Sequence, residues 1–106
     1  MQLINKKFFF LILLFLFIFN SAFAESKMKL GSEVFNNKAQ CGVCHTLKAA
    51  GSKGEIGPNL DLLKPQIDQI IMVVTNGIGV MQPWDGILTE DEIEAVAYYV
   101  FQNTNK

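Results

Sequence analysis

The chain has 106 residues, with nine lysines, no arginine and ten acidic residues, and half of its residues are hydrophobic. One domain is expected at this length. The slight negative charge and the absence of arginine argue against binding to nucleic acid or to an anionic membrane surface.

The N-terminus has the layout of a secretory signal peptide. Two lysines precede twelve uninterrupted apolar residues, 8–19, and an Ala-Phe-Ala sequence follows. This order predicts cleavage after Ala24, giving a signal peptide of residues 1–24 and a mature domain of residues 25–106 in the periplasm. The alternative is an uncleaved anchor that holds the protein on the outer face of the inner membrane. The apolar core is shorter than the roughly 20 residues that span a bilayer, which favours cleavage.

The mature domain is small and acidic. It carries seven lysines against ten acidic side chains, a net charge of −3. A domain of this size buries little apolar surface and usually needs a disulfide, a metal or a large apolar cofactor. The acidic balance favours protein partners with basic docking faces.

A first helix is predicted over residues 28–40, and Ser32 is a possible N-cap. Apolar residues fall on one side of it: Leu30, Val34 and Phe35. The segment 49–58 holds three glycines and a proline, so it is expected to be a loop.

Two further helices are predicted closer to the C-terminus. Residues 65–76 repeat apolar side chains with helical spacing and end at an Asn-Gly pair. Residues 90–101 follow a capping box of Thr89 and Glu92 and carry one apolar stripe. The two apolar sets are Ile67, Ile70, Ile71 and Val74, and Ile93, Val96, Ala97, Val100 and Phe101. No segment alternates with period two, so the predicted fold class is all-α, with three to four helices and long loops.

The motif that carries the chemistry is Cys41-Gly42-Val43-Cys44-His45. It holds the only two cysteines and the only histidine of the chain. C-x-x-C-H is the attachment motif of c-type haem. Two thiols at this spacing can form thioethers with the two vinyl groups of one haem, and His45 then reaches the iron from the same turn. The motif therefore predicts one covalent haem c and its iron.

Three other interpretations of the two cysteines have less support. A structural zinc site needs four ligands, and the chain has no further cysteine or histidine. A thioredoxin-like redox pair belongs in a βαβ unit and has a lowered thiol pKa, and no strands are predicted here. A disulfide across two residues would close a very short loop and stabilise little.

Met72 and Met81 are the candidates for the second axial ligand of the iron. Met72 falls inside the second predicted helix, where packing is the favoured role. Met81 follows two glycines in a loop and precedes Pro83, so the chain can approach a haem closely and is then stiffened. Ligation by Met81 would close the iron to small ligands and raise its potential, which favours electron transfer. An open iron site, for small-ligand binding or in an enzyme subunit, is the alternative.

These residues together resemble the class I cytochrome c family, specifically its small bacterial members of the cytochrome c5 and c6 type. The matching features run in family order and cover essentially the whole mature chain. They are Gly31 and Phe35, Cys41 to Thr46, Gly57 to Leu60, the Met81 loop and the helix over residues 90–101. The resemblance implies the small cytochrome c fold wrapped around one covalent haem, and an electron carrier rather than an enzyme.

The resemblance also implies roles beside the haem. Pro58 would offer its backbone carbonyl to the far ring nitrogen of His45, which fixes the ring. Trp84 would lie against the haem or near a propionate. Many relatives have a proline directly after the ligand methionine, whereas here Gln82 follows Met81.

A helix crossing is implied as well. Gly31 would lie where the first and last helices cross, and Phe35 would pack there with Tyr98 or Tyr99. Six positions separate Phe35 from Cys41, where the shortest family members have four. The turn between the first helix and the motif is therefore expected to be longer.

The sequence thus predicts a monomeric one-electron carrier of a respiratory or related chain. A donor such as a quinol-oxidising complex would reduce it, and a terminal oxidase or another reductase would oxidise it. Contact with the membrane would be peripheral at most. The predicted cofactor-binding residues are Cys41, Cys44, His45, Pro58, Met81 and Trp84, with His45 and Met81 as iron ligands.

Overall fold

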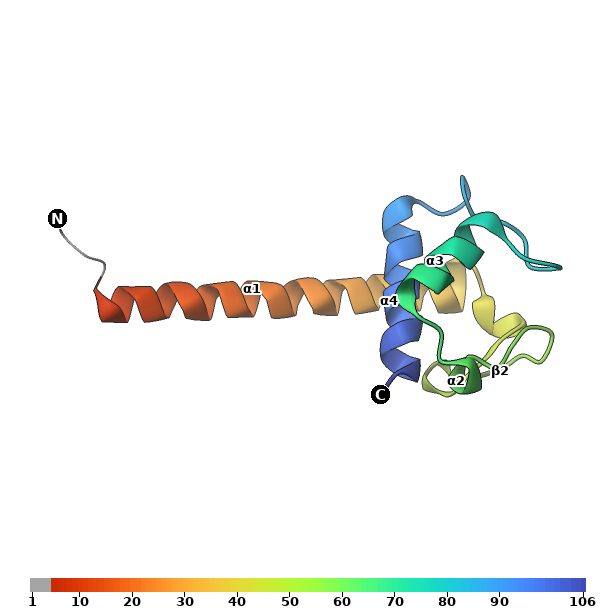
Figure 1. The fold of residues 1–106 in the computed structure, drawn as a ribbon, viewed down its shortest axis with the longest axis horizontal. Coiled ribbons are helices and arrows are strands. Elements are labelled where there is room, and N and C mark those ends of the chain that lie inside the picture. Colours follow the sequence, from red (N-terminus) through yellow and green to blue (C-terminus); the bar gives the residue numbers. More distant parts are fainter. Residues whose placement is uncertain (1–4) are drawn as a thin grey trace.

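The backbone confirms the predicted all-α class (Figure 1). The computed structural model describes residues 5–106, apart from the side chains of residues 18–20. The helices are α1 (Lys6–Glu33), α2 (Leu60–Leu63), α3 (Ile67–Asn76) and α4 (Glu90–Thr104), and the antiparallel strands are β1 (Thr46–Leu47) and β2 (Ser52–Lys53). A π-helical turn spans Val34–Lys38, and 3-10 turns span Cys41–Val43 and Lys48–Ala50.

Helix α1 is much longer than predicted. It runs unbroken through most of the predicted signal peptide, whose first four residues lie outside the described residues. Its N-terminal part extends away from the other elements, and its large apolar side chains from Phe8 to Phe17 are exposed (Figure 1). Among the described residues, one helical stretch, Lys6–Lys38, is long and apolar enough to cross a membrane, a test that an N-terminal signal sequence also passes.

The predicted start of the first helix at Met28 and its N-cap at Ser32 are wrong. No proline separates the apolar core from the end of α1, so nothing interrupts the helix. Ser32 is an interior residue of α1, and its hydroxyl accepts a hydrogen bond from Asn36 Nδ2 at 3.2 Å.

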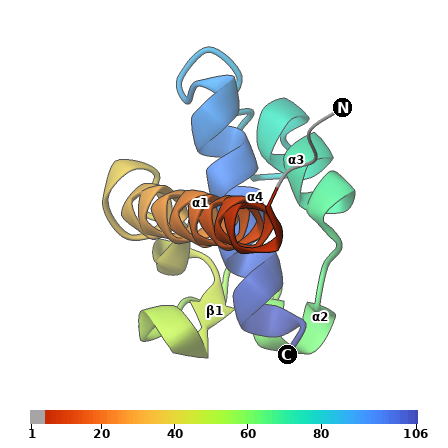
Figure 2. The ribbon, with the colours of Figure 1, turned by 90° about the vertical axis from the view of Figure 1, so that its left-hand side faces the viewer.

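Helices α1 and α4 cross each other (Figures 1 and 2), and Gly31 lies at the crossing. A Cβ atom on Gly31 would lie 2.2 Å from the backbone oxygen of Ala95 and 2.6 Å from the Cβ of Tyr99. Such distances are far below van der Waals contact, so only glycine fits between the two backbones. The expected role of Gly31 as the crossing point is therefore confirmed.

The π-helical turn accommodates the longer connection to the motif. The N–H of Ala39 donates to the carbonyl of Val34 at 2.8 Å, five residues back, which is the spacing of a π-turn. Gln40 then adopts a left-handed backbone with a φ of 49° and directs the chain into Cys41.

Phe35 keeps its place at the helix crossing despite the longer connection. It is 1% exposed, and its ring centroid lies 5.7 Å from that of Tyr99. Tyr99 is thus the tyrosine that packs at the crossing. Tyr98 is half-buried, and the Lys27 ammonium lies 5.4 Å from its ring centroid.

Helix α3 packs on α4 through the predicted stripe, in which Ile70 and Val74 are buried. It begins at Ile67 rather than at Pro65, because Gln66 is still extended. Met72 lies outside the stripe and is 58% exposed, so the interpretation of Met72 as a packing residue is wrong.

The N-terminus of α4 has the predicted capping box. The Thr89 hydroxyl accepts from the Glu92 N–H, and the Glu92 carboxylate accepts from the Thr89 N–H. The Lys38 ammonium pairs with Glu92 at 2.6 Å and, with the Thr89 N–H, holds the pKa of Glu92 below its ordinary value. Because the pKa of Glu92 is lower in the folded state, its ionised carboxylate stabilises the fold above the ordinary carboxyl pKa. This contribution to the free energy of unfolding is lost as pH falls through the pKa of Glu92 in the folded protein.

Two short elements occur where no regular structure was predicted. The strands have two residues each, too few for an alternating pattern, and β2 falls in the predicted loop. Helix α2 is a single turn capped by Asn59, whose side chain accepts from the Leu62 N–H at 3.3 Å. The predicted loop therefore has local structure that positions the segment after the motif.

Replacing Gly31 with alanine should destabilise the protein by about 1–3 kcal/mol, because the new methyl group would overlap the backbone of α4. By helix propensity alone the same change would stabilise an interior position by about 1 kcal/mol. Urea unfolding of the purified protein gives the measurement, and Lys29→Ala, on an exposed position of the same helix, is the control. A G31A protein as stable as the wild type would contradict the crossing.

Candidate functional site

The motif residues form one tight turn. Its 3-10 turn is closed by hydrogen bonds from the N–H groups of Cys44 and His45 to the carbonyl of Cys41, at 3.2 and 3.0 Å. Both cysteines are free and half-buried. Two thiols and one imidazole therefore project from a single segment of five residues.

The environment of Cys41 disfavours nucleophilic attack by this thiol. Burial raises the pKa of the Cys41 thiol to about 11. A thioredoxin-like pair needs a lowered thiol pKa, because the thiolate is the nucleophile. The described residues also contain no group of three or more His, Cys, Asp or Glu side chains that could hold a metal ion.

The ring of His45 is held by the segment that follows β2. Its Nδ1 lies 2.8 Å from the carbonyl oxygen of Pro58, the contact that the resemblance implies. A carbonyl can only accept, so Nδ1 carries the proton, and Nε2 of the neutral ring keeps its lone pair. The imidazole is therefore in the tautomer that can bind a metal through Nε2.

Gly57 lies directly against the His45 ring. A Cβ on Gly57 would lie 2.5 Å from Cε1 and 2.8 Å from Nδ1 of His45. The Gly57 N–H also donates to the carbonyl of Cys44 at 2.7 Å. Gly57 was expected only as part of a motif, and its contact with the ring was not predicted. The available signal was a residue without a side chain directly before Pro58, where backbone conformation is already restricted.

Met81 lies on a well-ordered turn between α3 and α4. Met81 and Ile78 exchange two backbone hydrogen bonds, at 2.9 and 3.0 Å. Gly77 ends α3 with a φ of 72°, and a Cβ there would lie 2.6 Å from the carbonyl oxygen of Met81. The half-buried Met81 side chain packs against the core. These contacts fix the backbone that carries the thioether.

Trp84 ties the same loop to α3. Its backbone N–H donates to the carbonyl of Val74 at 2.9 Å, and its half-buried side chain packs against the core. Cys41, Met81 and Trp84 thus all contact one hydrophobic cluster. In Figure 1 the loop between α3 and α4, which holds Met81 and Trp84, lies on the same side of α4 as the β1–β2 segment, away from the N-terminus of α1. Pro58 and the motif are in direct contact, whereas Met81 and Trp84 belong to a separate loop.

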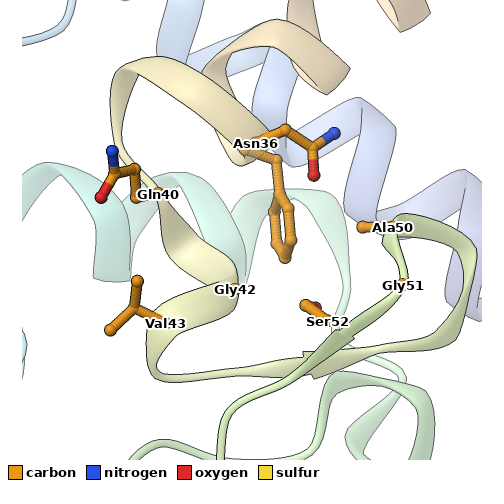
Figure 3. A pocket seen from close by; sticks show the side chains of 8 residues that line it. Asn36, Gln40, Gly42, Val43, Ala50, Gly51 and Ser52 are labelled. Carbon is orange, nitrogen blue, oxygen red and sulfur yellow. The ribbon is translucent and has the colours of Figure 1, made fainter.

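A pocket of about 320 Å³ lies behind the motif turn (Figure 3). It is lined by Phe35, Asn36, Gln40, Gly42, Val43, Ala50, Gly51 and Ser52. Neither thiol and no imidazole reaches it, so it does not offer the attachment chemistry. At this pocket Ser52 lies close to the backbone of the motif, since a Cβ on Gly42 would lie 2.5 Å from the Ser52 Cβ.

The residues present fit a covalent haem. The motif supplies two free thiols and an imidazole with an available Nε2, and Met81 supplies a thioether. Apolar side chains beside Gly57 and Met81 are strongly exposed: Ile56 at 70%, Ile78 at 65% and Val80 at 92%. A flat apolar macrocycle with an iron centre matches this combination of ligands and surface.

Comparison with known proteins agrees with this chemistry. Residues 26–100 match the family model described as cytochrome C oxidase, cbb3-type, subunit III. Cytochrome c6 of Chlorolobion braunii is 37% identical over 87 residues, which cover 73% of this chain and 91% of that protein. Cytochrome c6 of Tetradesmus obliquus is 33% identical over 91 residues, which cover 76% and 96%.

A solved structure shows the same fold. The crystal structure of the c-type cytochrome SorU from Sinorhizobium meliloti superposes with a TM-score of 0.71 at 50% identity, covering 77% of this chain and 95% of that one. The chain therefore belongs to the c-type cytochromes, as a small class I member. It is a haem-based electron carrier and not an enzyme, and its Cys41 and Cys44 fit the covalent attachment of haem c.

Replacing Gly57 with alanine should displace the His45 ring and destabilise the haem-bearing protein by about 1–3 kcal/mol. The haem Soret band should shift as well, because the imidazole that is expected to bind the iron moves. Gly51→Ala is the matched control: its φ of 69° strains the backbone, but no atom lies within 4 Å of the new methyl group. Urea unfolding and the visible spectrum provide the measurements. A Soret band that shifts equally in both variants would contradict contact between Gly57 and His45.

Proposed function

We propose that this protein is a one-electron carrier of a respiratory or related electron-transfer chain, with His45 and Met81 as the axial ligands of its haem iron. The observation that carries the proposal is the 2.8 Å contact between His45 Nδ1 and the Pro58 carbonyl, which leaves Nε2 available. The ordered turn at Met81 supports the second ligand.

The chain's own groups would keep the coordination nearly unchanged between oxidation states. Pro58 and Gly57 hold the imidazole plane, and Gly77 and Ile78 hold the backbone of Met81. The haem supplies the reversible one-electron chemistry of its iron. A thioether ligand favours the ferrous state and raises the reduction potential. With both axial positions filled, no site would remain for a small molecule, and no side chain needs to act as an acid, base or nucleophile.

Met72 is the competing thioether, because its exposure of 58% leaves it free of the core. It lies on α3, whose conformation is fixed by the helix, whereas Met81 follows a turn that contains Gly77 and Gly79 at positive φ. A turn of this kind allows the backbone to approach a planar cofactor closely. We therefore assign the ligand to Met81.

The proposed location is the periplasm, after cleavage behind Ala24. The order of lysines, apolar core and Ala-Phe-Ala sequence supports this assignment. The continuous helix α1 also has the length and composition of a membrane span. The intact mass of the exported protein distinguishes a cleaved signal peptide from a retained anchor. Cleavage leaves a chain that begins at Glu25 and carries one haem. A mass that includes residues 1–24 would indicate a retained anchor.

Replacing Met81 with alanine should abolish the weak near-infrared band that marks methionine ligation of ferric haem, and should open the ferrous iron to carbon monoxide. Replacing Met72 with alanine is the control and should leave both properties unchanged. If M72A loses the band instead, the assignment of the ligand is wrong. Rapid binding of carbon monoxide by the wild-type protein would favour the alternative function, a haem protein with an open iron site.

The proposed partners are a quinol-oxidising donor complex and a terminal oxidase or reductase, each with a basic docking face. The net charge of −3 on residues 25–106 supports electrostatic attraction to such faces. Reduction of the ferric protein by the cationic complex hexaammineruthenium(II) should therefore slow as salt rises from about 10 to 300 mM, because screening weakens the attraction. Reduction by the ascorbate anion is the control and should not slow. A rate with the cationic reagent that ignores ionic strength would contradict electrostatic docking.

A further inference from the structure

Ser52 connects β2 to the motif through its hydroxyl group. Its Oγ donates to the carbonyl oxygen of His45 at 3.0 Å and accepts from the N–H of Leu47 at 3.0 Å. A longer contact of 3.4 Å reaches the carbonyl of Leu47. The shorter distance identifies His45 as the main acceptor of the single hydroxyl proton.

Ser52 is also held in place from the opposite side. Its Cβ would lie 2.5 Å from a Cβ on Gly42, so its side chain lies against the backbone of the motif turn. It pairs with Leu47 across the two strands, and Leu47 is fully buried. Figure 3 shows Ser52 beside Gly42. The position of the Ser52 hydroxyl is therefore fixed beside the carbonyl of His45.

The hydroxyl completes the restraint of His45. The N–H of His45 is bound to Cys41 on one side, at 3.0 Å, and its carbonyl is bound by Ser52 on the other. The ring nitrogen Nδ1 is bound to Pro58. Both the main chain and the ring of His45 are thus fixed by short contacts.

Two of these restraints come from one segment. Ser52 begins it, and Gly57 and Pro58 end it, against the ring of His45. Loss of the hydroxyl contact would allow this segment to move relative to the main chain of His45. The distance between Nδ1 and the Pro58 carbonyl would then be less well defined.

We propose that Ser52 is a positioning residue for the axial histidine, which acts by fixing the segment 52–58 on the His45 carbonyl. The inference rests on the proposed function, because it requires His45 to bind the iron. A hydrogen bond from Nδ1 to a carbonyl makes the imidazole more basic, which stabilises ferric iron. Weakening that bond should raise the reduction potential.

Thr46 provides a matched control for a purely structural role. Its hydroxyl donates to the carbonyl of Gly54 at 2.9 Å, so it ties β1 to the residue that follows β2, within the segment 52–58. It makes no hydrogen bond to the His45 carbonyl or ring among the described contacts. Thr46→Val and Ser52→Ala therefore both remove one hydroxyl that holds the segment 52–58, but only the second removes a hydrogen bond to His45 itself.

The test uses the haem-bearing protein and two readouts. Exchange of the His45 Nδ1 proton with deuterated solvent, followed by NMR of the reduced protein, should be about two- to tenfold faster in S52A, the effect of one lost hydrogen bond. The reduction potential of S52A should lie above that of the wild type. T46V should change both by less than S52A does, because the hydrogen bond to the His45 carbonyl remains, and Ser52→Thr, which keeps the hydroxyl, should keep both at the wild-type value.

A wild-type exchange rate and potential in S52A would overturn the proposal, and so would equal changes in S52A and T46V. Ser52→Val has the size of Thr and suits a strand, so it replaces S52A if that variant fails to mature with haem. The comparison of S52V with S52T then gives the same decision. A wild-type spectrum without histidine ligation would reject the proposed function instead, before any variant is compared.

Discussion

The close crossing of α1 and α4 is the constraint on which the rest of the structure depends. Gly31 brings two backbones within a distance that no side chain permits, and Phe35 and Tyr99 then pack beside it. Helix α1 ends just after the crossing. The π-helical turn Val34–Lys38 then accommodates the longer connection between α1 and the motif. The motif turn therefore begins at a defined place against the core, with Cys41 in contact with it.

The segments that follow the motif turn hold the imidazole of His45 in place. Hydrogen bonds fix the N–H, the carbonyl and the Nδ1 of His45, and Gly57 lies against the ring. With His45 as the proposed axial ligand, this arrangement suits an electron carrier, because a ligand that does not move between oxidation states lowers the reorganisation that accompanies electron transfer. The same rigidity suits a small domain in which one large apolar cofactor replaces part of a missing core.

Several features were predictable because their signals are local. The capping box at Thr89 and Glu92 and the apolar stripe of α3 depend on residues within one helix, and both were confirmed. The start of the first helix was not predictable from its cap, because neither proline nor glycine separates it from the preceding apolar segment, which is also helical. Met72 was judged by its apolar neighbours, although its position on the helix directs it away from α4 and leaves it 58% exposed.

By itself, the sequence determined the attachment chemistry and the helical class. C-x-x-C-H places two thiols and an imidazole on one short segment, and helical periodicity depends only on neighbours along the chain. The resemblance implied the contact of His45 with Pro58, and the tertiary structure alone showed that Gly57 and Ser52 hold His45 as well. The contact of Gly57 with the ring crosses 12 positions of the chain, and the hydroxyl of Ser52 lies in a glycine-rich loop without any motif. Such contacts depend on how the chain returns to the motif after β2, and that path is set by packing against the core rather than by any pattern in the residues that make it.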